Sequence, residues 1–218
     1  MGFRKLFEFL RDLEQNNSKA WMDEHRSRYE EVRDFYISWL NEMDIKLAKV
    51  DPDYSPTTGK QAINRINNNL MFHPNKPIYK DHFGAGLDKD GEHCDFYMHL
   101  GTSENFIAGG FYKPKPSILK SLRQAIDYNG DELKKIINKK GFKEMFGGLI
   151  DDGDSLKTSP KGFSQDHKHI DLLRRKTIAV QTGITQKEVL GADYQDRVVE
   201  IYLEMLPFRE YLNQAISV

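Results

Sequence analysis

The sequence predicts an α+β fold in which an antiparallel β-meander packs against several helices, including one long N-terminal helix. Three observations predict it: helical spacing of apolar residues over residues 1–50, strict alternation of apolar and polar residues at 93–101, and a return to helical spacing after position 116. The chain has 218 residues, a length typical of one domain, so we expect a single domain over 1–218.

The first two predicted helices cover the N-terminal quarter of the chain. Apolar residues at steps of three and four predict a helix over 3–15. Asn17 or Ser18 then provides an N-cap for the second helix. We expect this helix to continue unbroken to about Val50, because its apolar residues form one stripe over roughly eight turns.

The centre of the chain predicts strands. Residues 93–101 alternate in polarity, and 81–87 and 105–113 flank them across short links, as in a meander. A preceding strand is expected at 62–65. Glycines at 84, 86, 109 and 110 indicate bulges or the close approach of another group.

The C-terminal half returns to helix. Helices are predicted over 117–128, up to Asn129-Gly130, and over 132–139, with Gly141 as the residue after the helix. A short helix near 142–146, another at 171–176 and an extended segment at 177–181 follow. The last helix is predicted over 192–216, with an interruption at Pro207.

Composition narrows the class of protein. The formal net charge is -1, and apolar residues make up 39% of the chain with 11% aromatic, which is enough for a packed core and excludes global disorder. No apolar run approaches the roughly 20 residues of a membrane-spanning helix, so no membrane partner is expected. A single cysteine, Cys94, suits a reducing compartment, and we expect a bacterial-type cytoplasmic protein.

Positive charge is concentrated in two segments. Residues 113–140 carry 8 basic and 3 acidic side chains, and residues 157–176 carry 6 and 2. Two such segments in a nearly neutral protein favour a local anion site over nucleic-acid binding, which usually needs a basic bias across a whole domain. The alternative is that these lysines line a solvated helix face.

The segment 64–80 holds four Asn among its first six residues, which predicts a loop, because Asn side chains compete with the backbone for hydrogen bonds. Arg65, Lys76 and Lys80 add positive charge, and Tyr79 adds a phenol. Such a loop suits a phosphate or carboxylate, held by charge-assisted hydrogen bonds. The alternative is a structural loop whose Asn side chains cap backbone groups.

His167, beside Asp166, is the best candidate for general acid–base chemistry, because histidine titrates near neutral pH. His167, His169 and Asp171 match no common zinc spacing, so no metal is expected. The alternative for His167 is a helix-entry residue that bonds to the backbone.

The polar face of the meander offers Tyr97 and His99, with His82 and Lys113 nearby in the sequence. If this face is the floor of a pocket, these side chains meet the Asn-rich loop; the alternative is a face that is exposed to water and has no function. Cys94 falls on the apolar face and is expected in the core. The chain has no Gly-rich phosphate loop, no Ser elbow and no recognisable Cys–His pair, so it indicates no particular reaction.

Several separated motifs together are similar to one known family. They are Phe9-Leu10 with Leu13, Asn16-Asn17 and Trp21; Arg65 with Phe72, Asn75-Lys76 and Tyr79-Lys80; Gly109-Gly110; Phe146-Gly147-Gly148-Leu149; and Lys161-Gly162-Phe163 with Asp166-His167 and Ile170-Asp171-Leu172-Leu173-Arg174. The chain resembles domain-of-unknown-function family 2461, a bacterial family of conserved hypothetical proteins. The resemblance covers nearly the whole chain and implies a single domain without an established activity.

The family's signature has the form Arg-x-x-Arg-Asp-x-Arg-Phe, followed by Asp/Asn-Lys-x-x-Tyr. This chain departs from it at Asn68, Asn69 and Met71, where the pattern has Arg, Asp and Arg. Neutral groups therefore replace two guanidinium groups and a carboxylate, which weakens an anion clamp that depends on them.

The expected function is a small anionic-ligand binding domain for a phosphate ester or nucleotide, and catalysis would depend on His167. The predicted ligand-binding residues are Arg65, Asn68, Lys76, Tyr79, Lys161 and Arg174. A protein-interaction module that presents its sheet or long helix is the alternative, and nucleic acid is the least favoured partner. No cofactor is expected.

Overall fold

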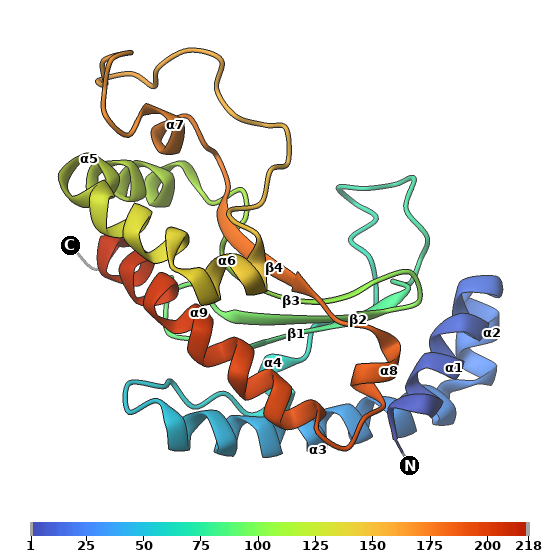
Figure 1. Ribbon diagram of the computed structural model, residues 1–218. Helices are drawn as coiled ribbons and strands as arrows, with labels where there is room; N and C mark the ends of the chain where they lie inside the picture. Colours follow the sequence, from blue (N-terminus) through green and yellow to red (C-terminus); the bar gives the residue numbers. More distant parts are fainter. Residues whose placement is uncertain (1, 217–218) are drawn as a thin grey trace. The chain divides into compact units, whose positions relative to one another are not determined.

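The computed structural model describes residues 2–216 and has the predicted α+β fold (Figure 1). Its four strands are β1 (His82–Leu87), β2 (Phe96–Gly101), β3 (Asn105–Phe111) and β4 (Ile178–Gly183), which form one antiparallel sheet in the order β1-β2-β3-β4. The three-strand meander is therefore confirmed. Residues 177–181, predicted only as an extended segment, contribute most of the fourth strand.

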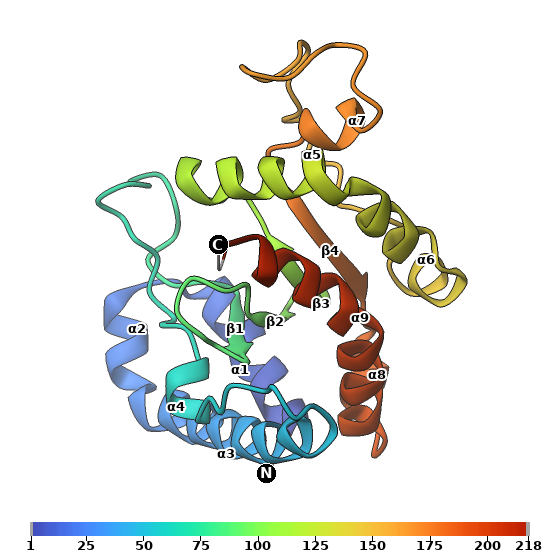
Figure 2. The same ribbon diagram turned by 90° about the vertical axis from the view of Figure 1, so that its left-hand side faces the viewer.

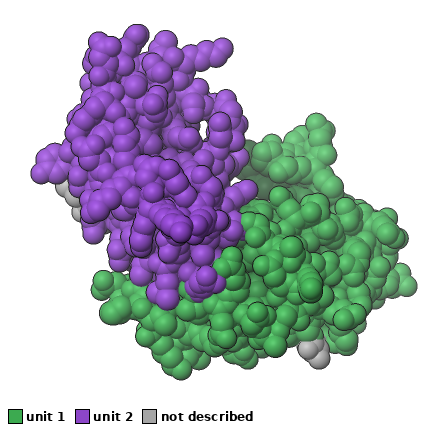
Figure 3. All heavy atoms as spheres, viewed as in Figure 1, with its two compact units in different colours: residues 1–89, 96–107, 183–199 green, residues 90–95, 108–182, 200–218 purple. Residues whose placement is uncertain are grey.

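The chain divides into two compact units (Figure 3). Unit 1 comprises residues 1–89, 96–107 and 183–199, and unit 2 comprises residues 90–95, 108–182 and 200–218. The expectation of a single domain over 1–218 stays a prediction.

Unit 1 is built on the N-terminal helices α1 (Phe3–Gln15), α2 (Lys19–Glu24) and α3 (Arg26–Val50), with α4 (Gly59–Ala62) beside α3 (Figures 1 and 2). The predicted bounds of α1 are confirmed. Ser18 caps α2, where its hydroxyl accepts a hydrogen bond from the Trp21 amide. The long helix α3 ends at Val50, as the sequence predicts.

The prediction of one unbroken second helix is wrong. The backbone leaves helical geometry at His25 (φ -103°, ψ 20°), which ends α2 and precedes α3. Nδ1 of His25 lies 2.9 Å from the carbonyl oxygen of Trp21, and the two rings stack with centroids 4.2 Å apart. The Trp21 carbonyl thus accepts from the His25 backbone N–H at 2.9 Å and also lies within hydrogen-bond distance of the His25 ring.

The predicted strand at 62–65 is also wrong. Residues 59–62 form α4, closed by a capping box between Thr58 and Gln61. Only an isolated bridge, between Ile63 and Ala85, joins this segment to β1. The capping box provides the start signal that the sequence analysis overlooked.

The two faces of the β1–β2 pair differ in chemistry. In the observed register Phe83 opposes Leu100 and Ala85 opposes Met98, so one face is apolar, and all four residues are buried. Helix α3 covers this face, where Tyr29 stacks on Phe83 with centroids 6.3 Å apart. This contact forms the core of unit 1 and leaves the other face for polar groups.

Glycine shapes the polar face. His82 opposes Gly101 and His99 opposes Gly84, so each ring lies across the sheet from a residue without a side chain. A Cβ at Gly84 would lie 2.6 Å from the Tyr97 hydroxyl and 3.1 Å from Asn64 Nδ2. The close approach predicted at this glycine is therefore made by side chains of unit 1 itself.

Unit 2 contains helices α5 (Pro116–Asn138), α6 (Lys140–Phe146) and α7 (Ile170–Leu173) and most of α9 (Tyr194–Ile216). The predicted break at Asn129-Gly130 is a kink inside α5, where Asn129 has φ -138° and ψ 40°. Gly141 does not terminate a helix as predicted but lies within α6. The interruption predicted at Pro207 is wrong, because α9 continues through it, and a short helix α8 (Gln186–Val189) precedes α9.

The core of unit 2 includes a buried cation. Arg209, 1% exposed, donates hydrogen bonds through Nε and Nη2 to the carbonyl oxygen of Cys94, at 3.3 and 2.7 Å. Burial raises the pKa of the Cys94 thiol, although the Arg209 charge opposes this. A buried thiol of raised pKa fits the expected core role of Cys94.

Candidate functional site

The Asn-rich segment 64–80 has an ordered base. Asn67 and Tyr79 form an antiparallel bridge, the Asn68 amide donates to the Ile78 carbonyl (2.9 Å), and the Lys80 amide donates to the Ile66 carbonyl (2.8 Å). Beyond this base, the His73 amide donates to the Asn69 carbonyl at 3.0 Å and closes a turn. The segment is therefore a stem with a turned tip, and we call it the 64–80 loop.

Asn17 ties this stem to the helices of unit 1. Its side-chain NH2 donates to the Tyr79 carbonyl at 2.9 Å, and its side-chain oxygen accepts from the Tyr79 amide at 3.0 Å. The amide side chain thus pairs with Tyr79 as a neighbouring strand would. Asn17 was predicted only as a possible helix cap. In the structure its side chain attaches the loop to the helices of unit 1.

A cavity of about 340 Å³ opens beside the stem. It is lined by Glu14, Asn17, Asn68, Lys76, Pro77, Tyr79, Lys80, Asp81 and His82. Three of the predicted ligand-binding residues, Asn68, Lys76 and Tyr79, therefore line one cavity. Arg65, the fourth from this loop, is not among the lining residues.

Cations gather at this cavity. The Lys80 ammonium donates to the backbone carbonyl of Arg65 at 2.7 Å. Burial lowers the pKa of Lys80, and the positive charges of Arg65 and Lys76 lower it further. Within residues 2–216, none of these three side chains forms an ion pair with a carboxylate.

The polar face of the meander reaches the same cavity through His82. Nδ1 of His82 lies 2.8 Å from Oδ1 of Asp81, and its ring stacks on His99 with centroids 3.9 Å apart. His99 also stacks on Phe106, with centroids 4.5 Å apart, and its Nδ1 lies 3.4 Å from the Tyr97 hydroxyl oxygen. His82 was not among the predicted site residues, although an Asp-His pair at the start of a strand is visible in the sequence.

Protonation differs along this row of rings. Burial lowers the pKa of His99 to about 4, with a further contribution from the charge of His82. Burial raises the pKa of Asp81, but the hydrogen bond and charge of His82 outweigh this, so the net pKa is lowered. Near neutral pH, Asp81 is therefore an anion and His99 is a neutral ring.

The remaining predicted site residues belong to unit 2. His167 accepts a hydrogen bond at Nδ1 from the His169 amide (3.0 Å), and its Nε2 lies 2.9 Å from Oδ1 of Asp127. Since an amide can only donate and a carboxylate only accepts, the neutral ring carries its proton on Nε2. Both ring nitrogens therefore have partners, the His169 amide and the Asp127 carboxylate. A bond from His167 to the backbone is what the alternative to a catalytic role predicts. The catalytic role of His167 stays a prediction.

Lys161 and Arg174 also stay predictions. Lys161 is exposed, and Nε of Arg174 is buried without a hydrogen-bond partner in residues 2–216. Several cations of the two basic segments are already paired: Lys168 with Asp131 at 2.6 Å and Lys176 with Asp154 at 2.6 Å. These pairs reduce the positive charge that unit 2 presents to an anion.

Unit 2 has a larger cavity, of about 580 Å³, between α5 and α9. Its lining consists of Ser121, Gln124, Ala125, Tyr128, Asn129, Tyr211, Gln214 and Ala215, and none of these side chains carries a charge at neutral pH. The smaller cavity of unit 1 is therefore the better candidate for an ionic ligand. The part of the chain that the structure describes contains no group of three or more His, Cys, Asp or Glu side chains placed to hold a metal ion.

The comparisons with known proteins agree with the resemblance seen in the sequence. A family model described as "Conserved hypothetical protein (DUF2461)" matches residues 5–211. The chain belongs to the DUF2461 family. No curated protein and no solved structure matches this DUF2461 chain. Between residues 2 and 216, none of its helices combines the length and apolar character needed to cross a bilayer.

Proposed function

We propose that the cavity beside the 64–80 loop binds a small anionic ligand, such as a phosphate ester or nucleotide. The observation that carries the proposal is the grouping of Arg65, Lys76 and Lys80 without a carboxylate partner among the described residues. Keeping like charges close together costs free energy, and an anion placed between them would recover it. Glu14 and Asp81 line the same cavity, but among the described residues neither carboxylate forms an ion pair with these cations.

The geometry assigns different tasks to the lining residues. Lys80 is held by the Arg65 carbonyl, so part of its conformational freedom is already lost before a ligand binds. Lys76 is exposed and supplies charge at the rim. Asn68 bonds across the stem to the Pro77 carbonyl at 2.9 Å and fixes the shape of the cavity. These contacts favour an ionic ligand that is small enough for about 340 Å³.

Calorimetric titration with sulfate and with glycerol phosphate tests the proposal. Lys80→Met and Lys76→Ala should each lower the affinity by on the order of tenfold or more, because each removes a charge-assisted hydrogen bond worth about 1.5–3 kcal/mol. Lys60→Ala, at an exposed lysine of α4, is the matched control and should bind as wild type. Lys76→Ala should leave the unfolding temperature unchanged, and Lys80→Met should lower it only by the loss of its bond to the Arg65 carbonyl. Loss of stability without loss of binding would overturn the proposal.

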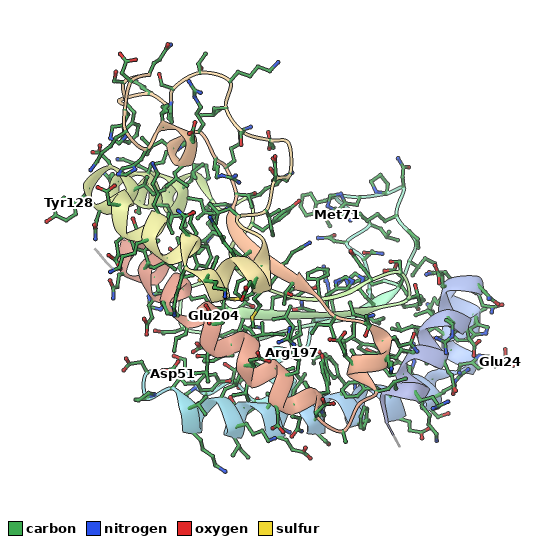
Figure 4. All side chains as sticks on the ribbon, viewed as in Figure 1. Glu24, Asp51, Met71, Tyr128, Arg197 and Glu204 are labelled. Carbon is green, nitrogen blue, oxygen red and sulfur yellow. The ribbon has the colours of Figure 1, made fainter. Side chains whose placement is uncertain are left out.

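A second function is favoured by one specific observation at the tip of the loop. Met71 and Phe72 are 84% and 72% exposed, and Met71 lies at the outer end of the loop (Figure 4). Residues 64–80 carry three cations and no acidic side chain. This alternative is an interaction module whose apolar tip enters an apolar recess of a partner protein with an acidic rim.

The two functions respond to different substitutions. The double substitution Met71→Ser/Phe72→Ser should release such a partner and leave sulfate binding intact. Leu203→Ser, at another exposed apolar residue, should retain the partner. A partner that both variants retain, or one without an acidic surface, would contradict the alternative.

A further inference from the structure

The net charge of the cavity lining depends on one imidazole. Lys76 and Lys80 contribute two positive charges to the lining, while Glu14 and Asp81 contribute two negative charges. These charges cancel when His82 is neutral and leave one positive charge when His82 is protonated. Arg65, near Lys80 but outside the lining, adds to the positive side in both cases.

Two neighbouring side chains fix the position of the His82 ring. Asp81 occupies its Nδ1 at 2.8 Å, and His99 covers its ring at a centroid distance of 3.9 Å and an interplanar angle of 25°. Nε2 of His82 has no hydrogen-bond partner within residues 2–216, and its side chain is 22% exposed. One nitrogen is thus fixed by the protein, and the residue that carries the other lines the cavity.

We propose that His82, held by Asp81, is the third cationic donor of the cavity and that the ligand is a dianionic tetrahedral oxyanion, a phosphate or sulfate group. This inference rests on the proposed anion-binding function. Lys76, Lys80 and protonated His82 together supply three cationic donors to one small cavity. Two negative charges spread over several oxygens satisfy these donors better than the single charge of a carboxylate. A monocarboxylate such as acetate is therefore a poor ligand.

The other titratable groups around His82 are Asp81, His99, Glu14, Lys76, Lys80 and Tyr79. Asp81 and His99 have lowered pKa values, that of His99 being about 4, so both are deprotonated between pH 5.5 and 8. Histidine is the side chain whose charge changes within that range. Protonation of His82 adds one positive charge to the lining, so we expect sulfate to bind more tightly at the acidic end of that range.

Sulfate is the appropriate probe, because it keeps two negative charges throughout this pH range. Titration calorimetry of the full chain should give an affinity for sulfate at least roughly tenfold higher at pH 5.5 than at pH 8.0. His82→Gln should bind weakly at both values, and His73→Gln, at an exposed histidine of the same loop, should behave as wild type. Glycerol phosphate at pH 6.5 distinguishes an esterified phosphate from a free oxyanion, according to which of the two anions binds more tightly.

A second measurement uses the unaltered chain. By linkage, a tenfold preference of sulfate for protonated His82 raises the titration midpoint of that ring, followed by NMR, by about one pH unit. If wild type binds no anion at any pH, the anion-binding function itself fails. If sulfate binds equally at both pH values, or if the pH dependence persists in His82→Gln, the role of His82 is overturned while the anion site is retained. Lys80 would then be the first group to test as the source of the pH dependence.

Discussion

The attachment of the 64–80 loop depends on one side chain, Asn17. Its amide group makes two hydrogen bonds to the backbone of Tyr79, at 2.9 and 3.0 Å, although the residues lie 62 positions apart in the chain. Tyr79 is 4% exposed, so water has little access to replace these bonds. Asn17→Ala removes both partners at once and should loosen the stem.

The expected cost follows from these two bonds. A net hydrogen bond contributes about 0.5–1.5 kcal/mol, and a buried group left without a partner costs about 1–3 kcal/mol. The Asn17 site is only partly buried, so we take the lower half of both ranges, that for a lost bond and that for a group left unpaired. For two bonds, Asn17→Ala should therefore lower the free energy of unfolding by about 2–3 kcal/mol. Sulfate affinity should fall as well, because Asn17 and Tyr79 both line the cavity.

Urea unfolding followed by circular dichroism measures the change in stability, and hydrogen exchange of the Tyr79 amide locates it. Asn16→Ala is the control, because the side chain of exposed Asn16 makes, within residues 2–216, a single hydrogen bond, to the Asp12 carbonyl. It should cost about 0.5 kcal/mol or less. If Asn17→Ala unfolds within about 0.5 kcal/mol of wild type and the Tyr79 amide keeps its protection, the reasoning about the stem is wrong.

Two further predictions concern buried imidazoles. Since the folded-state pKa of His99 is about 4 and an unfolded histidine titrates near 6.5, stability falls as the pH drops from about 6.5 to 4 and then levels off. After allowance for solvent screening, this loss of unfolding free energy is about 1–2 kcal/mol. Urea unfolding measured across that pH range should show no such loss in His99→Phe. If the stability of the variant depends on pH as strongly as that of wild type, another group is responsible. Gly130→Ala in the kinked α5 would place a Cβ 2.6 Å from Cδ2 of the buried His169. It should lower the unfolding free energy by about 1–3 kcal/mol. Gly183→Ala is the control, because Gly183 has open space around it, and this substitution should change the unfolding free energy little. Equal thermal shifts for the two glycine variants would contradict the packing argument.

Much of the fold was predictable, because the elements that carry it have strong local signals. Apolar periodicity gave the bounds of α1 and the end of α3, and alternation gave the meander. Asn129-Gly130 marked the kink in α5. The break at His25 was missed because neither Pro nor Gly is present there to indicate it.

The site residues within the 64–80 loop could be predicted from the sequence, but the lining residues from other elements could not. Residue types alone pointed to Lys76 and Tyr79, because charge and aromatic groups are visible in a sequence. Asn17 and His82 depend on contacts with residues distant in the chain or across a sheet, which local patterns do not encode. His167 drew attention by its chemistry, but its two nitrogens are engaged by Asp127 and the backbone.

The most direct test of the anion-binding cavity is a sulfate titration of the isotope-labelled chain, followed by backbone amide chemical shifts at pH 6. The cavity predicts saturable shifts concentrated at Asn17, Asn68 and Lys76 and along residues 79–82, with the same residues unmoved in Lys80→Met. Shifts that are absent, or that fall on the basic residues of α5 instead, would contradict the assignment of this cavity as the anion site.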